Sequence, residues 1–187
     1  VAGSDADLVY LLSTSGVMKS VDGGASFMPA STGLPTSGFF ARDLALRPGT
    51  PDTLVLTSSS HGAFRSMDGG ASWAAIGTGT LPVRLSQVAF DPGNPAVLLV
   101  SPCAPEDGSA YTGAHLYRSA DGGASFTGIS VSGMDPGTAT CTAALAFSPV
   151  TSGLVLGSDG SGPFAPFNTV LRSTDAGVDV MGDGGLV

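Results

Sequence analysis

The sequence contains very few of the residues that build long surface helices. Among 187 residues there is one lysine, Lys19, and one glutamate, Glu106, and charged residues make up only 12%. Exposed helix positions are usually filled by Glu, Lys, Gln and Arg. Their scarcity excludes an all-α fold, whereas 28 glycines and 13 prolines indicate a chain with many turns.

Positive charge is also scarce. Seven Lys and Arg residues stand against 15 Asp and Glu, which gives a formal charge of −8. Because no basic stripe is present to neutralise phosphates, we expect no nucleic-acid partner and no attraction to anionic lipid.

Long hydrophobic runs are absent. Runs such as residues 96–100 are far shorter than the roughly 20 residues needed to cross a bilayer, so we expect no membrane span. No basic segment followed by an apolar stretch marks a signal peptide at the start. A mature chain whose leader had been removed would look the same.

The sequence has two cysteines, Cys103 and Cys141. Two cysteines do not define a disulfide framework. They either form one disulfide, if the compartment is oxidising, or remain two buried thiols. The Cα separation decides between these alternatives, and the sequence does not give it.

A repeated motif, Ser-x-Asp-Gly-Gly-x-Ser-aromatic, organises the chain. It occurs in three close copies and a weaker fourth, and successive first aspartates are 46, 53 and 54 residues apart, about the length of a four-stranded propeller blade. The motif residues are Ser20, Asp22, Gly24 and Phe27; Ser66, Asp68, Gly70 and Trp73; Ser119, Asp121, Gly123 and Phe126; and Ser173, Asp175 and Gly177.

Further repeated elements lie between the motifs. Residues 43–48, 87–92 and 144–149 alternate small or apolar side chains and end in proline, as expected for a strand and turn. An apolar run and then a strand ending in Arg-Ser follow each of them. Each unit is therefore predicted to hold four short strands, and consecutive similar units favour a β-propeller.

The motif itself has the chemistry of a tight turn between the third and fourth strands of a blade. The carboxylate can accept hydrogen bonds from turn amides, the glycines allow positive φ, and the aromatic side chain can pack between blades. Four copies of a catalytic acid would serve no purpose, so we interpret the motif as structural.

These motifs resemble the Asp-box, or BNR, repeat of sialidases, xyloglucanase-type endoglucanases, sortilin-type receptors and a photosystem assembly factor. The resemblance covers about residues 6–180. It implies an all-β propeller of four-stranded antiparallel blades, with structural Asp-box turns on one face and ligands on the opposite, loop face. The fourth copy departs from the pattern, because Ala176 replaces a glycine and Val180 replaces the aromatic.

The predicted blades do not complete a ring of the usual size. They span about residues 6–28, which lack a first strand, 41–77, 86–130 and 140–180. Propellers close with about four to eight blades. Residues 1–187 are therefore one propeller domain or a fragment of one, completed by the rest of a longer chain, completed by a second copy, or closed as a small ring.

Two long loops on the expected ligand face, residues 101–114 and 158–168, are the candidate binding site. The candidate residues are Glu106, Asp107, Tyr111, Asp159, Phe164, Phe167 and Asn168. Aromatic rings with acids and an amide suit sugar rings, whereas the alternative is that the loops pack on each other. Phe39 and Phe40, at the entry to a strand, belong to a segment that also reaches this face. We expect them in the core, and the alternative is a ligand platform.

Catalytic arrangements are poorly supported. Arg65, Arg118 and Arg172 each precede a motif serine and so repeat for a structural reason, which leaves too few arginines for a sialidase. A xyloglucanase-type glycoside hydrolase needs two carboxylates across a cleft. The acids expected on the loop face are Glu106, Asp107, Asp135 and Asp159.

The remaining reactive residues also favour a structural interpretation. His61 and His115 occupy near-equivalent repeat positions. We find no metal-ligand spacing and expect no cofactor.

The sequence thus favours a non-catalytic binding or interaction scaffold that is secreted, periplasmic or on a cell surface. Its partner would be a polysaccharide or a protein at the loop face. The alternative is a fragment of a glycoside hydrolase that acts on polysaccharide. A third hypothesis is an assembly factor that binds a protein around Phe164 and Phe167.

Overall fold

A computed structural model describes residues 7–13, 16–104, 113–129, 142–147, 154–158, 170–173 and 181–183. For residues 142–143 and those from 154 onward, only the backbone is described. Every regular element in these ranges is a β-strand. Within the same ranges, no helix is long and apolar enough to cross a membrane.

The strands form four antiparallel sheets that follow one another along the chain. The first sheet contains β1 (Val9–Ser13), β2 (Gly16–Ser20) and β3 (Met28–Pro29). The second contains β4 (Ala41–Leu46), β5 (Leu54–Ser58), β6 (Gly62–Ser66) and β7 (Ala74–Ile76). The third contains β8 (Leu85–Phe90), β9 (Leu98–Pro102), β10 (Leu116–Ser119) and β11 (Thr127–Ile129). The fourth contains β12 (Thr142–Phe147), β13 (Leu154–Ser158), β14 (Val170–Ser173) and β15 (Met181–Asp183).

Each sheet is a simple meander in which consecutive strands pair. The first strand of each four-stranded sheet contains a register shift. The shifts lie between Ala41 and Asp43, between Leu85 and Val88, and between Thr142 and Ala144. Such bulges bend a strand and increase its twist. The repeated sequence units therefore adopt repeated backbone structure.

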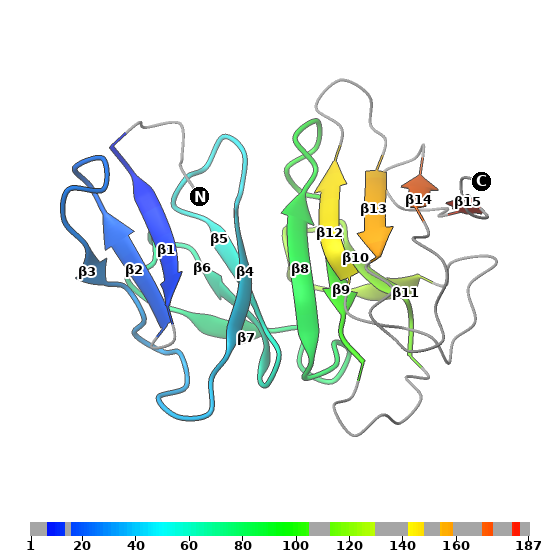
Figure 1. The fold of residues 1–187 in the computed structure, drawn as a ribbon, viewed down its shortest axis with the longest axis horizontal. Helices are drawn as coiled ribbons and strands as arrows, with labels where there is room; N and C mark the ends of the chain where they lie inside the picture. The colour runs from blue at the N-terminus through cyan, green and yellow to red at the C-terminus, as the bar shows by residue number, and fades with distance from the viewer. Residues whose placement is uncertain are drawn as a thin grey trace.

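The sheets stand beside one another in chain order, as the blades of a propeller do (Figure 1). The first strands β4, β8 and β12 lie next to one another, and β1 contacts β4. This arrangement places the turns between third and fourth strands at one end of the sheets, which we call the motif end. The turns between second and third strands lie at the opposite end, which we call the loop end.

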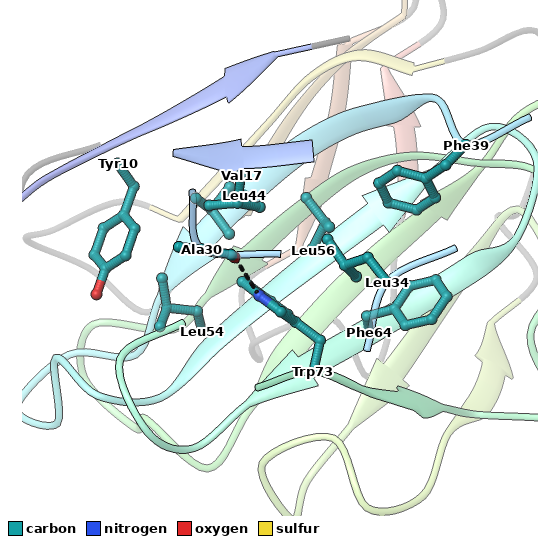
Figure 2. Packing of buried hydrophobic residues seen from close by; sticks show 10 residues of the cluster. All are labelled: Tyr10, Val17, Ala30, Leu34, Phe39, Leu44, Leu54, Leu56, Phe64 and Trp73. Atoms are coloured by element: carbon teal, nitrogen blue, oxygen red, sulfur yellow. Dashed lines mark hydrogen bonds between the residues drawn. The ribbon is translucent and has the colours of Figure 1, made fainter. Parts of the chain in front are cut away.

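Apolar side chains pack between neighbouring sheets. Strand β5 is buried along its whole length, and its alternating side chains face different neighbours. Leu54 and Leu56 join the cluster shared with the first sheet, whereas Val55 joins the cluster shared with the third. Figure 2 shows the first of these clusters, in which Tyr10, Val17 and Ala30 of the first sheet join Trp73, and Ala30 lies beside the Trp73 indole.

Candidate functional site

Three turns at the motif end, residues 20–27, 66–73 and 119–126, share one hydrogen-bonding pattern; we call them the Ser-Asp turns. In the second, the Ser66 hydroxyl donates to Asp68 Oδ1 at 2.8 Å and accepts from the Gly70 amide at 2.8 Å. Asp68 Oδ1 also accepts from the Ser72 amide at 2.8 Å, and Oδ2 accepts from the Ser72 hydroxyl at 2.5 Å. Gly69 and Gly70 have φ of 67° and 87°, conformations that would be strained for a residue with a side chain.

The other two Ser-Asp turns repeat these contacts. Ser20 and Ser26 bind Asp22 in the same way, and Ser119 and Ser125 bind Asp121. Each carboxylate is therefore held within its own turn.

These hydrogen bonds stabilise the ionised form of each carboxyl group. The hydroxyl of Ser26 and then that of Ser20 lower the pKa of Asp22 from 3.8 to about 2. The Ser72 hydroxyl and amide, and then the Ser66 hydroxyl, lower the pKa of Asp68 to about 2, and the equivalent bonds from Ser125 and Ser119 lower the pKa of Asp121 even further. A general acid needs a raised pKa, so these groups are unsuited to proton donation near neutral pH.

The first glycine of the second and third Ser-Asp turns joins neighbouring sheets. The Lys19 ammonium and the Tyr10 hydroxyl, both from the first sheet, donate to the Gly69 carbonyl of the second at 2.9 Å. Arg65 of the second sheet donates to the Gly122 carbonyl of the third at 3.0 Å. Lys19 and Arg65 both precede a motif serine, so the repeated cation of the sequence contacts the next sheet.

The motif aromatics also make contacts between sheets. Trp73 is 5% exposed, and its indole N–H donates to the Ala30 carbonyl of the first sheet at 2.8 Å (Figure 2). Phe126 is buried in the cluster that contains Val55 and Ala63 of the second sheet. Phe27, in contrast, is 36% exposed, so the expected packing between blades does not extend to the first copy of the motif.

A pocket of about 270 Å³ lies at the motif end between the first and second sheets. Its lining includes Lys19, Met28, Ala30 and Gly70. Ala30 and Ile76 are repeat equivalents, and the Ile76 Cδ1 lies 3.3 Å from an ideal Cβ position on Gly123. At the equivalent Gly70, the atoms nearest to that position are Tyr10 Cε1 at 3.3 Å and Ala30 Cβ at 3.5 Å.

The loop end presents exposed apolar and basic side chains from neighbouring turns. Phe40 is 63% exposed and Val83 is 64% exposed. The turn between β5 and β6 joins them, because the Ser59 amide donates to the Phe40 carbonyl and the Gly62 amide donates to the Val83 carbonyl. Arg42, two residues after Phe40, and His61, in the turn between β5 and β6, are also exposed.

Phe39 and Phe40 differ, although both were expected in the core. Phe39 is buried and stacks edge-on against Phe64, with ring centroids 5.7 Å apart. Phe40 points the other way because successive side chains of an extended chain alternate in direction. The core prediction therefore holds for Phe39 and is wrong for Phe40, whose side chain is exposed at the loop end.

The carboxylates that the structure describes either accept hydrogen bonds from the main chain, as Asp43 does, or lie at the motif end. Asp43, in β4, accepts from the Leu44 amide at 2.8 Å through Oδ1 and from the Val88 amide of the next sheet at 2.9 Å through Oδ2. It thus joins the second and third sheets. Among the described residues, no group of three His, Cys, Asp or Glu side chains could hold a metal ion.

The predicted ligand residues lie outside the described residues. They are Glu106, Asp107, Tyr111, Asp159, Phe164, Phe167 and Asn168. The same holds for Asp175 and Gly177 of the fourth motif, and Ser173 is described only as the last residue of β14. Cys103 is buried and disulfide-bonded, whereas Cys141 lies outside the described residues.

Comparison with known proteins identifies the fold. No protein-family model matches the sequence, and no curated protein matches it. Among solved structures, an ancestral GH74 enzyme matches 97% of this chain at 23% identity, with a TM-score of 0.77. A GH74 enzyme from Niastella koreensis matches 96% at 21% identity, with a TM-score of 0.69.

A structure of YCF48 bound to D1 peptide also matches 96% of this chain, at 17% identity and a TM-score of 0.63. The chain covers 23% and 28% of the two GH74 chains and 52% of the YCF48 chain. It therefore spans about half the length of one neighbour and under a third of the others. These similarities confirm the fold class: the chain is an all-β protein with the architecture of part of a β-propeller.

Proposed function

We propose that this chain forms part of a polysaccharide-binding propeller and that the glycan lies across the loop end. The observation that carries the proposal is the strip of exposed Phe40, Val83, Arg42 and His61 at that end. We further propose that the Ser-Asp turns are Asp-boxes, whose role is to close the third and fourth strands of each blade.

The chemistry of the strip suits a sugar chain. The exposed ring of Phe40 offers a flat apolar face, and Arg42 offers several hydrogen-bond donors to hydroxyl groups. The backbone beneath Phe40 is fixed, because its amide donates to the Ser60 hydroxyl at 3.2 Å and its carbonyl accepts from Ser59. A rigid platform loses little entropy when it binds a ligand.

Binding to xyloglucan tests this proposal, since one structural neighbour is a xyloglucanase from Xanthomonas campestris. Replacing Phe40 by alanine should weaken binding about tenfold, which corresponds to a loss of about 1.4 kcal/mol. Met67→Ala is the matched control, because Met67 is 70% exposed but lies in a Ser-Asp turn at the opposite end. Equal affinities for both variants, or no binding of xyloglucan or other plant and microbial polysaccharides, would contradict the proposal.

The catalytic alternative is a fragment of a glycoside hydrolase, and it rests on the GH74 neighbours. It requires a carboxylate pair about 5–10 Å apart across the glycan. The acids to test are Glu106, Asp107, Asp135 and Asp159. If the chain releases oligosaccharides from xyloglucan, one of the single amide variants should abolish the release while binding persists; a chain that binds but releases nothing supports the scaffold.

A protein partner is the second candidate function, favoured by the similarity to YCF48 bound to D1 peptide. An exposed ring at the loop end can equally pack on an apolar peptide side chain. This candidate would be supported if the chain bound a peptide but no polysaccharide, and if Phe40→Ala abolished the binding of the peptide.

We propose an extracytoplasmic location, secreted, periplasmic or on the cell surface. The disulfide at Cys103 supports it, because disulfides persist in oxidising compartments.

A further inference from the structure

One face of the first sheet is exposed where the second and third sheets bury theirs. In the first three sheets, the second-strand residue that pairs with the motif serine is Val9, Leu54 or Leu98, so these three positions are equivalent. Two residues later in the same strands, Leu11, Leu56 and Val100 are equivalent too. Leu11 is 51% exposed, whereas Leu56 and Val100 are fully buried.

Phe27 shows the same difference. It is 36% exposed, while its equivalents Trp73 and Phe126 are 5% and 8% exposed. Trp73 is buried because the first sheet lies against it, and Phe126 because the second does. Phe27 and Leu11 belong to the face of the first sheet that is turned away from the second, and we call it the open face.

The path of the chain into β1 matches the path into β5 and β9, the second strands of the next two sheets. The first glycine of each Ser-Asp turn donates its amide to the residue two positions before the second strand. Gly23 donates to Asp7 at 2.9 Å, Gly69 to Asp52 at 2.9 Å and Gly122 to Ala96 at 2.8 Å. Asp52 and Ala96 follow β4 and β8, so the chain reaches Asp7 as though from a first strand.

We propose that the open face docks another blade of the Ser-Asp type, carried upstream of Asp7 in a longer form of the same polypeptide. Its third strand would end in Lys-Ser or Arg-Ser, and that cation would donate to the Gly23 carbonyl, as Lys19 does to Gly69 and Arg65 to Gly122. The connecting segment would add a first strand along β1, in the place that β4 takes beside β5. Covering Leu11 and Phe27 removes apolar surface from water, which drives the association.

The chain can supply its own test blade. Residues 41–95 contain the second sheet and β8, which is the first strand of the sheet whose third and fourth strands flank Phe126. Placing a copy of residues 41–95 directly before Asp7 gives β1 a first strand and gives Phe27 the neighbours that Phe126 has. The experiment compares this extended chain with the 187-residue chain.

The thermal midpoint of Phe27→Ala is measured in both chains. We expect a shift below about 3 °C in the 187-residue chain and a shift of about 6–20 °C in the extended chain. Phe126→Ala is the matched control and should shift the midpoint by the larger amount in both chains. Leu11→Ala, a smaller truncation on the same face, repeats the comparison if Phe27→Ala unfolds the extended chain.

Three results would overturn the proposal. One is an equal, small shift of Phe27→Ala in both chains, and another is an extended chain less stable than the 187-residue chain. The third is a doubled mass of the 187-residue chain by light scattering that Phe27→Ala returns to a single mass. That result would mean that a second copy, and not an upstream blade, covers the open face.

Discussion

Trp73 offers the most direct test of packing between blades. Its indole is 5% exposed, and its N–H donates to the Ala30 carbonyl at 2.8 Å. Replacing a large buried aromatic by alanine costs about 3–5 kcal/mol, because it removes apolar contacts and leaves a cavity. In a protein of this size, each kcal/mol lowers the thermal midpoint by about 2–4 °C, so Trp73→Ala should lower it by about 6–20 °C.

Circular dichroism should follow this transition, since Trp73 is the single tryptophan and its fluorescence disappears with it. Trp73→Phe should cost less, about 1–3 kcal/mol, because the ring is largely kept and the carbonyl loses its donor. The fold accepts phenylalanine at the equivalent Phe126. Met67→Ala, at a 70% exposed residue, should change stability by less than about 0.5 kcal/mol. A loss below about 1 kcal/mol for Trp73→Ala would refute the assignment of Trp73 to the interface.

Two further predictions concern the Ser-Asp turns. Hydrogen bonds from Ser72 and Ser66 lower the pKa of Asp68 from 3.8 to about 2. Its folded-state pKa thus lies below the unfolded value, so the stabilisation is present above pH 3.8 and is lost as the pH falls to about 2. The thermal midpoint should fall over this range of pH, and it should fall less in Asp68→Asn than in the unmodified chain. An equal fall in both proteins would contradict the assignment of this pH dependence to Asp68. Arg65→Ala should cost about 1.5–3 kcal/mol by removing a charged donor from the Gly122 carbonyl, whereas Arg42→Ala at the exposed loop end should be nearly neutral in urea unfolding.

Much of the fold could be predicted from the sequence because the determining signals are local. Alternating strands, proline turns and the Ser-x-Asp-Gly-Gly motif each specify a hairpin, and their repetition specifies the succession of sheets. The position of Arg65 before a motif serine also indicated a structural role, and its contact with Gly122 gives the physical form of that role.

Other features depend on neighbours that a local pattern does not identify. Phe39 and Phe40 are adjacent and equally apolar, and only the phase of the extended chain decides which is buried. Phe27 matches Trp73 and Phe126 in sequence, but its burial depends on a sheet that must lie on the far side of it. The site predicted around Glu106 and Phe164 lies outside the described residues and stays a prediction.

The side chains that join successive sheets through hydrogen bonds share one kind of acceptor. Lys19, Arg65 and Trp73 all donate to main-chain carbonyls, of Gly69, Gly122 and Ala30. A carbonyl is present whatever side chain its residue carries, so these contacts do not require matched substitutions on the partner sheet. Unequal recombination within the gene can therefore duplicate or delete a whole unit while the hydrogen bonds between neighbouring sheets still form. The loops at the opposite end can then change in sequence independently.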